Sequence, residues 1–159
     1  MAHRLVDVTL LTLLGITLTS ATVRASCPAG ITLEQHFAGS AVVFVGRATA
    51  RKTTAAPLPK DWTTLTTFEV EDVWKGPTET TIGITTCGGA VEGIAESVTC
   101  SESIAFRPGA RYLVFASSRV SIASTSEPLA ANTSAPTALV DRATATLQWL
   151  SDKPHTTVR

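Results

Sequence analysis

The sequence has no surplus of either charge, and this absence excludes several classes of protein. Its 159 residues carry 13 basic and 13 acidic side chains, so it lacks the basic surplus typical of nucleic-acid-binding domains. Only 16% of the residues are charged while 44% are hydrophobic, a balance that excludes an intrinsically disordered chain. We therefore expect one folded domain with a packed core and no nucleic-acid partner.

Metal ligands are equally scarce. The three cysteines, Cys27, Cys87 and Cys100, show no C-x-x-C spacing, and the three histidines do not gather beside them. A structural zinc site needs such a cluster, so we expect no metal and no cofactor.

Catalytic residues are also not evident. His36 could activate a nucleophile, but a surface histidine on a short helix explains it. Glu69 and Glu71 alternate with apolar residues, as the solvated face of a half-buried strand would. We therefore predict that the protein is not an enzyme.

Long hydrophobic runs are missing except near the N-terminus. Residues 8–18 form an apolar stretch of 11 residues, which is too short to span a bilayer and typical of a signal-peptide core. Val23 and Ala25 suit the −3 and −1 positions of a cleavage site, so residues 1–25 are predicted to be removed, leaving Ser26 first. A lipoprotein signal would place Cys27 first, but Arg24 stands where such signals carry a large aliphatic residue. We expect a secreted or periplasmic protein with no stable membrane span in the mature chain.

An oxidising compartment should join two of the three cysteines and leave one over. A bridge from Cys27 to Cys100 would close a long loop and stabilise the fold by roughly 4 kcal/mol. A bridge from Cys87 to Cys100 would close a short loop and stabilise it less.

Alternating and β-branched segments predict a mainly β fold. Strands are expected at residues 41–50, 62–74, 79–87 and 111–117, with a short fifth strand at 120–123. Gly46 predicts a bulge or bend within the first strand, and residues 88–99 are expected to form a loop.

Helical signals flank these strands. Thr32 and Gln35 have the spacing of a capping box, which predicts a short N-terminal helix. Apolar residues at helical spacing predict a C-terminal amphipathic helix from Pro136 to about Ser151, and residues 152–159 are expected to be a flexible tail. Together the elements predict a five-stranded antiparallel barrel of the OB type over residues 26–151, with a β-sandwich as the alternative.

Three segments in this order resemble a known module. They are Cys27 followed by F-A-G-S-A-V-V-F-V-G-R (37–47), T-F-E-V-E-D-V-W-K-G (67–76) and C-S-E-S-I-A-F-R-P-G-A-R-Y-L-V-F-A (100–116). The set resembles the netrin-like module, and in particular bacterial proteins similar to the N-terminal domain of tissue inhibitors of metalloproteinases. That resemblance implies an OB barrel.

The same resemblance implies a disulfide and a binding edge. It pairs Cys27 with Cys100 and leaves Cys87 as a free thiol. The contact surface it implies consists of the exported N-terminus and a neighbouring ridge: Ser26, Cys27, Pro28 and Ala29 with Ser97, Val98 and Thr99.

The resemblance implies a non-enzymatic module that binds a protein, with an extracytoplasmic protease among the possible partners. In the animal inhibitors the first residue, a cysteine, chelates the catalytic zinc. With Ser26 first, the chelating amine would move by about 3.5 Å, so protease inhibition is secondary to plain protein binding. The alternative is an extracytoplasmic OB barrel that binds glycan or cell-wall oligosaccharide through Trp62 and Trp74.

Overall fold

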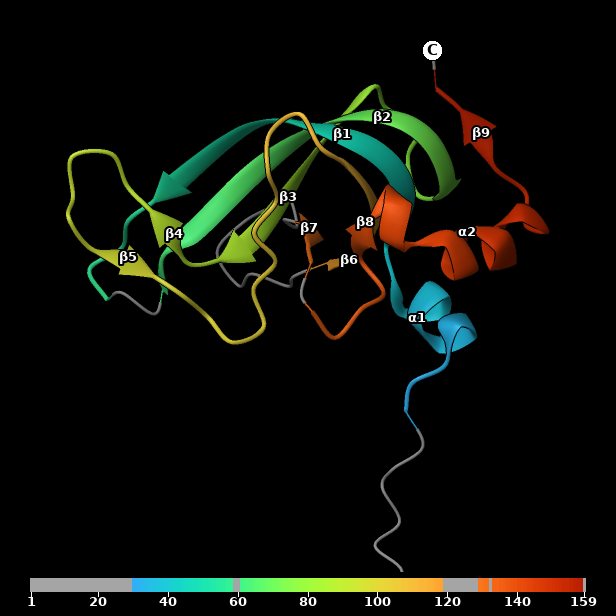
Figure 1. Cartoon of the computed structure of the whole chain (residues 1–159), viewed down its shortest axis with the longest axis horizontal. Coiled ribbons are helices and arrows are strands. Elements are labelled where there is room, and N and C mark those ends of the chain that lie inside the picture. Colours follow the sequence, from blue (N-terminus) through green and yellow to red (C-terminus); the bar gives the residue numbers. More distant parts are fainter. Residues whose placement is uncertain (1–29, 59–60, 119–128, 132, 159) are drawn as a thin grey trace, which may run out of the picture. The chain divides into compact units, whose positions relative to one another are not determined.

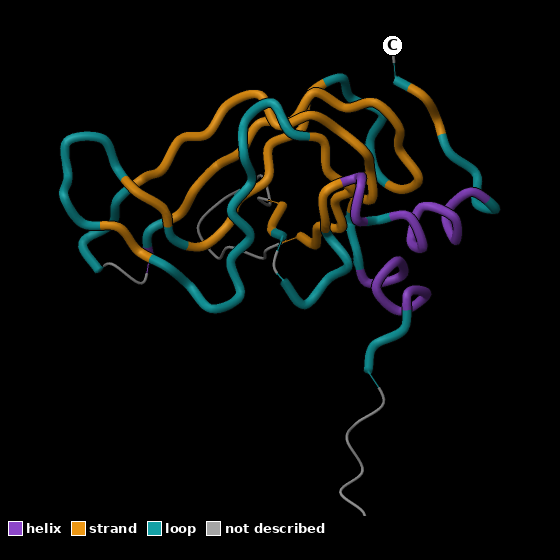
Figure 2. The backbone as a smooth tube through the Cα atoms, in the orientation of Figure 1, coloured by secondary structure: helices purple, strands orange, loops and turns teal. Residues whose placement is uncertain are grey.

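A ring of β-strands dominates the computed structural model, which describes residues 30–58, 61–118, 129–131 and 133–158 (Figures 1 and 2). The ring consists of β1 (Val42–Thr54), β2 (Thr63–Lys75), β3 (Thr81–Cys87), β6 (Arg111–Ser118) and β7 (Leu129–Ala130). Four of these strands confirm the predicted segments, with β1 extending four residues further than expected. The predicted strand at residues 120–123 lies outside the described residues.

The ring closes because β1 pairs with both β2 and β6. Around it the order is β1-β2-β3-β7-β6, and β6 returns to β1. The β3–β7 pair is parallel, whereas the other pairs in the ring are antiparallel. The expectation of a purely antiparallel sheet was therefore wrong. The strand β7 runs antiparallel to β6, starting beside the last residue of β6, and this direction is the same as that of β3 on its other side.

Bulges bend the long antiparallel pair formed by β1 and β2. Their pairing slips at three places, one of them between Val45 and Gly46, as the glycine predicted. A Cβ atom at Gly46 would lie 2.7 Å from the carbonyl oxygen of Glu69, so only glycine allows the two backbones to approach this closely. Bulges increase local twist and bend, which lets a few strands close into a ring.

Aromatic side chains fill the interior of the ring. Phe44, Phe68, Phe106 and Tyr112 are at most 4% exposed. Phe68 and Tyr112 each meet Phe106 edge-on, with ring centroids 4.9 Å apart in both pairs. Such edge-to-face pairs stabilise a core by about 0.5–1.5 kcal/mol each beyond the area they bury.

Two helices cover the opposite face of β1 and β6. Both predicted N-cap bonds form around α1 (Leu33–Gly39), which confirms the capping box. The second helix, α2 (Thr144–Ser151), is shorter than predicted. Upstream of it, β8 (Ala138–Leu139) pairs with β6 and a 3-10 turn, η2 (Val140–Arg142), follows, because these residues join the sheet before the helix can begin.

The C-terminal residues, for which the sequence predicted a flexible tail, also join the sheet. In β9 (Thr156–Thr157), the two residues pair with β2 just beyond the point where β3 begins, beside the end of β2 in Figure 1. The Thr157 hydroxyl donates to Asp72 at 2.7 Å, and Val158 packs against the core. The tail therefore covers an edge of β2 that would otherwise be open.

Candidate functional site

A small hairpin folds back against one end of the ring. The hairpin consists of residues 88–99, which we call the ribbon, and in it β4 (Gly89–Ala90) pairs with β5 (Ser97–Val98). Figure 1 shows the ribbon beside the last residues of β1 and the first residues of β2. The sequence predicted only a loop here, because strands of two residues have no detectable periodicity.

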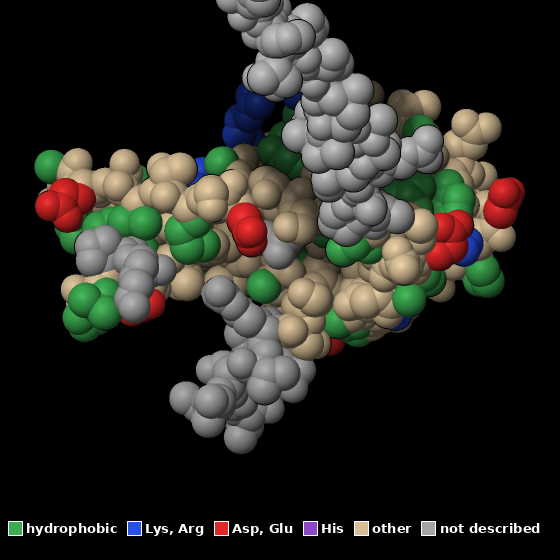
Figure 3. Space-filling model, turned by 90° about the horizontal axis from the view of Figure 1, so that it is seen from below, with side chains coloured by type: hydrophobic (Ala, Val, Ile, Leu, Met, Phe, Trp, Pro, Cys, Tyr) green, Lys and Arg blue, Asp and Glu red, His purple; other side chains and the backbone are tan. Residues whose placement is uncertain are grey.

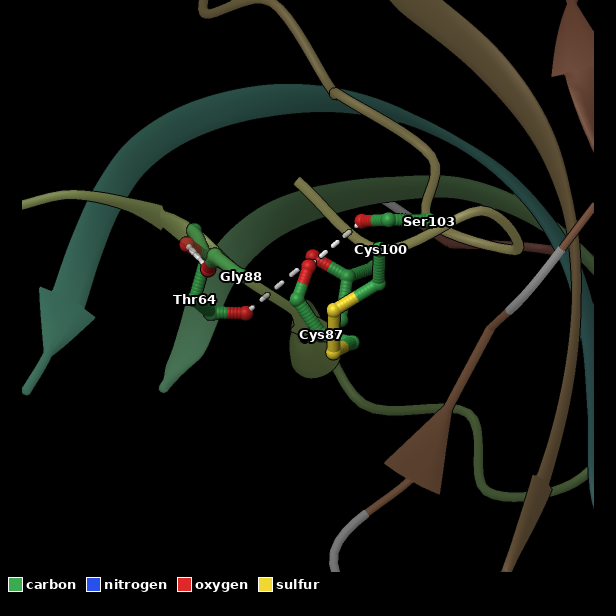
Figure 4. The surroundings of a disulfide bond; sticks show 6 residues. Thr64, Cys87, Gly88, Cys100 and Ser103 are labelled. Carbon is green, nitrogen blue, oxygen red and sulfur yellow. Dashed lines mark hydrogen bonds between the residues drawn. A yellow bond between two sulfur atoms is a disulfide. The ribbon is translucent and has the colours of Figure 1, made fainter. Parts of the chain in front are cut away.

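A disulfide holds both ends of the ribbon. Cys87 is bonded to Cys100, with Cα atoms 5.9 Å apart (Figure 4). This corrects the pairing of Cys27 with Cys100 and the free thiol at Cys87. The bridge that closes the short loop forms because Cys87, the last residue of β3, lies next to Cys100, which directly follows the ribbon. Cys27 itself lies outside the described residues.

Two adjacent glycines let the ribbon lie directly on the ring. Gly88 and Gly89 have φ angles of +79° and +129°, which side chains other than glycine rarely adopt. A Cβ atom at Gly89 would also collide with the hydroxyls of Thr64 and Thr53. The Gly-Gly pair is therefore what brings the ribbon into contact with β1 and β2.

Hydroxyl groups fix this contact. Thr64 donates to the carbonyl oxygen of Gly88 at 2.6 Å, and its oxygen lies 2.9 Å from that of Thr53. Ser103 donates to the carbonyl oxygen of Cys87 at 2.6 Å (Figure 4). Both carbonyls that flank the turn into the ribbon are thus satisfied by side chains, which makes the ribbon a defined element of the fold.

A cavity of about 200 Å³ lies between the ribbon and the ring. We call it the ribbon pocket. Its lining is rich in hydroxyls and includes one cation: Arg51, Thr64, Thr86, Cys87, Gly88, Gly89, Ser97, Val98, Thr99, Ser103, Ile104 and Ala105.

The predicted binding residues divide into two groups. Ser97, Val98 and Thr99 line the ribbon pocket beside Cys100, and Ser97 and Thr99 are exposed. The predicted residues Ser26, Cys27, Pro28 and Ala29 lie outside the described residues.

Sequence reasoning missed Arg51 and the glycine pair. Arg51 follows the predicted end of the first strand, and nothing in its surroundings distinguishes it from a solvated surface residue. The G-G dipeptide was the available signal, since two adjacent glycines often mark a backbone that must approach another closely.

Arg51 differs from Arg47 and Arg111, the other arginines on the ring, in having no partner among the described residues. Arg47 donates to the carbonyl oxygen of Gly109 at 2.9 Å, and Arg111 binds Glu71 through two nitrogens. The Glu71 carboxylate raises the pKa of Arg111 through these bonds. Among the described residues, nothing hydrogen-bonds to or pairs with the guanidinium of Arg51.

The tryptophans proposed as a sugar platform are engaged elsewhere. Trp62 is 5% exposed, and its indole N–H donates to the carbonyl oxygen of Ala56. Trp74 donates to the carbonyl oxygen of Leu150 and contacts the ring of His155. Trp62 immediately precedes β2 and Trp74 is its penultimate residue, so the two indoles lie at opposite ends of the strand and do not form one stacking surface.

Within the described part of the chain, no three metal-ligating side chains cluster and no helix is long and apolar enough to cross a membrane. Comparison with protein-family models, curated proteins and solved structures finds no match to the chain. Functional inference therefore depends on the geometry above.

Proposed function

We propose that this chain is an exported, non-enzymatic module that binds another protein through its ribbon. The main support is the way the ribbon is held: a disulfide at its ends, glycines against the ring and hydroxyl bonds beneath it. A surface that is ordered before binding loses little conformational entropy when a partner docks, which favours recognition.

The exposed residues of the ribbon suit a protein partner. Ile94, near its tip, is 43% exposed, and Glu92 and Glu96 flank it. An apolar side chain on an anchored hairpin offers a partner one apolar contact, with carboxylates on either side of it. On the face drawn in Figure 3, the described Lys and Arg side chains are scattered, so nothing there resembles the basic patch of a nucleic-acid binder.

Two further observations agree with this proposal. A ring of five strands closed through one very short strand is compatible with a partly open OB-type barrel, the architecture of the netrin-like module. The Cys87–Cys100 bond belongs in an oxidising compartment, in keeping with the leader-like residues 1–25. An extracytoplasmic protease is one partner that the resemblance suggests.

Site-specific photocrosslinking tests the proposal. A photoreactive phenylalanine replaces either Ala95, an exposed ribbon residue outside the pocket lining, or the exposed Thr81, at the other end of β3 from Cys87. Each variant is incubated with the extracytoplasmic fraction of the organism that encodes the chain. We expect one discrete crosslinked partner from position 95, lost when unlabelled wild-type protein is added in excess. Equal crosslinking from both positions, or none from position 95, would contradict the proposal.

A further inference from the structure

The ribbon pocket has the charge of an anion site. Arg51 supplies a cation, and no described lining residue is acidic. Five hydroxyls also line it, from Thr64, Thr86, Ser97, Thr99 and Ser103. Of these, the hydroxyls of Ser97 and Thr99 have no hydrogen-bond partner among the described residues, so they remain available to a ligand.

Strand pairing places Arg51 on the pocket side of β1. It lies opposite Thr66 in the β1–β2 pair, two positions from the pair of Thr53 and Thr64. Residues opposite each other in a sheet share a face, and Thr64 and Thr66 are buried on the inner one. Arg51 therefore belongs to the inner face at the mouth of the ring.

A second polar group at this position is unsatisfied. The hydroxyl of Thr66 is fully buried and has no hydrogen-bond partner within the described structure. An unpartnered guanidinium thus stands across from an unpartnered hydroxyl, next to a cavity. The Thr66 hydroxyl is not part of the pocket lining, whereas the exposed guanidinium of Arg51 and the exposed hydroxyls of Ser97 and Thr99 line the pocket as donors that an acceptor there can reach.

The size of the cavity limits the ligand. About 200 Å³ is below the range of roughly 300–1,000 Å³ typical of pockets for whole small molecules. It suits the end of one side chain or of one polypeptide. Val98, Ile104 and Ala105 supply apolar walls for a short stem behind the charged group.

From these observations we propose that the ribbon pocket receives a single carboxylate of the partner protein, held by the guanidinium of Arg51 and the hydroxyls of Ser97 and Thr99. Arginine presents two parallel N–H donors to a carboxylate, a geometry that lysine lacks. This inference rests on the proposed function, since the ribbon that contacts the partner also forms the pocket wall. The carboxylate comes from a Glu or Asp side chain or from a C-terminus.

NMR titration of the oxidised, ¹⁵N-labelled protein tests the inference with small probes. N-acetylglutamate N-methylamide represents a side-chain carboxylate, N-acetylalanine a C-terminal one, and N-acetylglutamine N-methylamide is the neutral match. We expect saturable shifts at the amides of Gly88, Gly89, Ser97 and Thr99 with at least one acidic probe and none with the glutamine probe. Whichever acidic probe binds more tightly identifies the source of the carboxylate.

Two matched variants separate a specific site from general charge attraction. Arg51→Gln should weaken the acidic probe by about tenfold or more, because a charged hydrogen-bond donor is lost. Lys52→Gln removes the same charge from the next residue, which faces outward opposite the exposed Leu65, and should leave binding unchanged. An unaltered ¹⁵N spectrum away from the pocket shows that each variant is folded.

The inference is overturned if the glutamine probe shifts the same amides equally, if neither acidic probe binds, or if both variants weaken binding alike. Crosslinking from position 95 is scored in parallel, because it does not depend on the probes and leaves every pocket hydroxyl in place. If the probes do not bind but crosslinking is retained, the carboxylate site is rejected and the proposed function stands. If neither probe binding nor crosslinking is observed, the carboxylate site and the proposed function are both rejected.

Discussion

The indole N–H of Trp149 donates to the carboxylate of Glu34 at 3.0 Å, joining α2 to α1 across 115 residues of sequence. Lys153 lies over the Trp149 ring, 4.1 Å from its centroid, and Phe37 meets that ring edge-on. The first helix is therefore held in place by the last one, through groups that are charged or aromatic.

This link should respond to acid. Donation from Glu34's own backbone amide, and then from Trp149, lowers the pKa of Glu34 from its ordinary value of 4.5. The contribution of the carboxylate to stability is thus present above pH 4.5 and is lost as the pH falls through the lower folded-state pKa. We expect the Trp149 indole N–H resonance to shift in a step centred below pH 4.5. Glu34→Gln should remove the step, and a midpoint at or above 4.5 would contradict the assignment.

The disulfide should contribute measurably to stability. Its cysteines are 13 residues apart, and closing a loop of that size stabilises a fold by about 3 kcal/mol in the chain-entropy model. Replacing Cys87 and Cys100 together by alanine should lower the urea midpoint accordingly, while Cys27→Ser should leave it unchanged. Peptide mapping under non-reducing conditions should recover one linked pair, Cys87 with Cys100. A Cys27-containing linked peptide would refute the pairing.

Gly89→Ala should destabilise the protein by about 2 kcal/mol or more, because the new methyl group collides with the Thr64 and Thr53 hydroxyls in addition to straining the backbone. Gly93→Ala is the matched control. Its φ of +81° is also positive, but a Cβ atom there meets nothing within 4 Å, so it carries the backbone strain alone. Urea unfolding measures both. If the two variants lose the same free energy of unfolding, the new methyl group at position 89 is accommodated at no cost beyond the backbone strain.

Removing residues 156–159 should cost about 2 kcal/mol, since the chain loses the packing of Val158 and the pairing of β9 with β2. Thr157→Val removes only the hydroxyl bond to Asp72 and should cost about 1 kcal/mol or less. Thermal unfolding monitored by circular dichroism compares the two. An unchanged midpoint for the truncated chain would mean that β9 adds nothing to the fold.

The main strands and the first helix could be predicted from sequence because their signals are local. Alternation along β2 places Phe68 and Val70 inward, and the capping residues Thr32 and Gln35 are three positions apart. Gly46 marked its bulge for the same reason, since a glycine inside an apolar strand often accompanies a bulge or a close backbone approach.

What sequence reasoning missed depends on contacts between distant segments. Cys100 has two possible partners, and only the path of the chain brings Cys87 beside it. The pairing of β9 and the place of Arg51 at the pocket are set by the register of β2 with its neighbours. Residues 138–139 have helical spacing but lie next to β6, so tertiary pairing overrides the local preference.

The β7 strand closes the ring with only Leu129 and Ala130, and each of its two neighbours meets it at just two residue pairs. Among the pairings within the ring, hydrogen exchange should therefore be fastest along this seam, where the fewest ladder bonds must break, while amides shared by β1 and β2 exchange only through global unfolding. When the seam opens, the edges of β3 and β6 become available together, and a strand from another molecule could insert there.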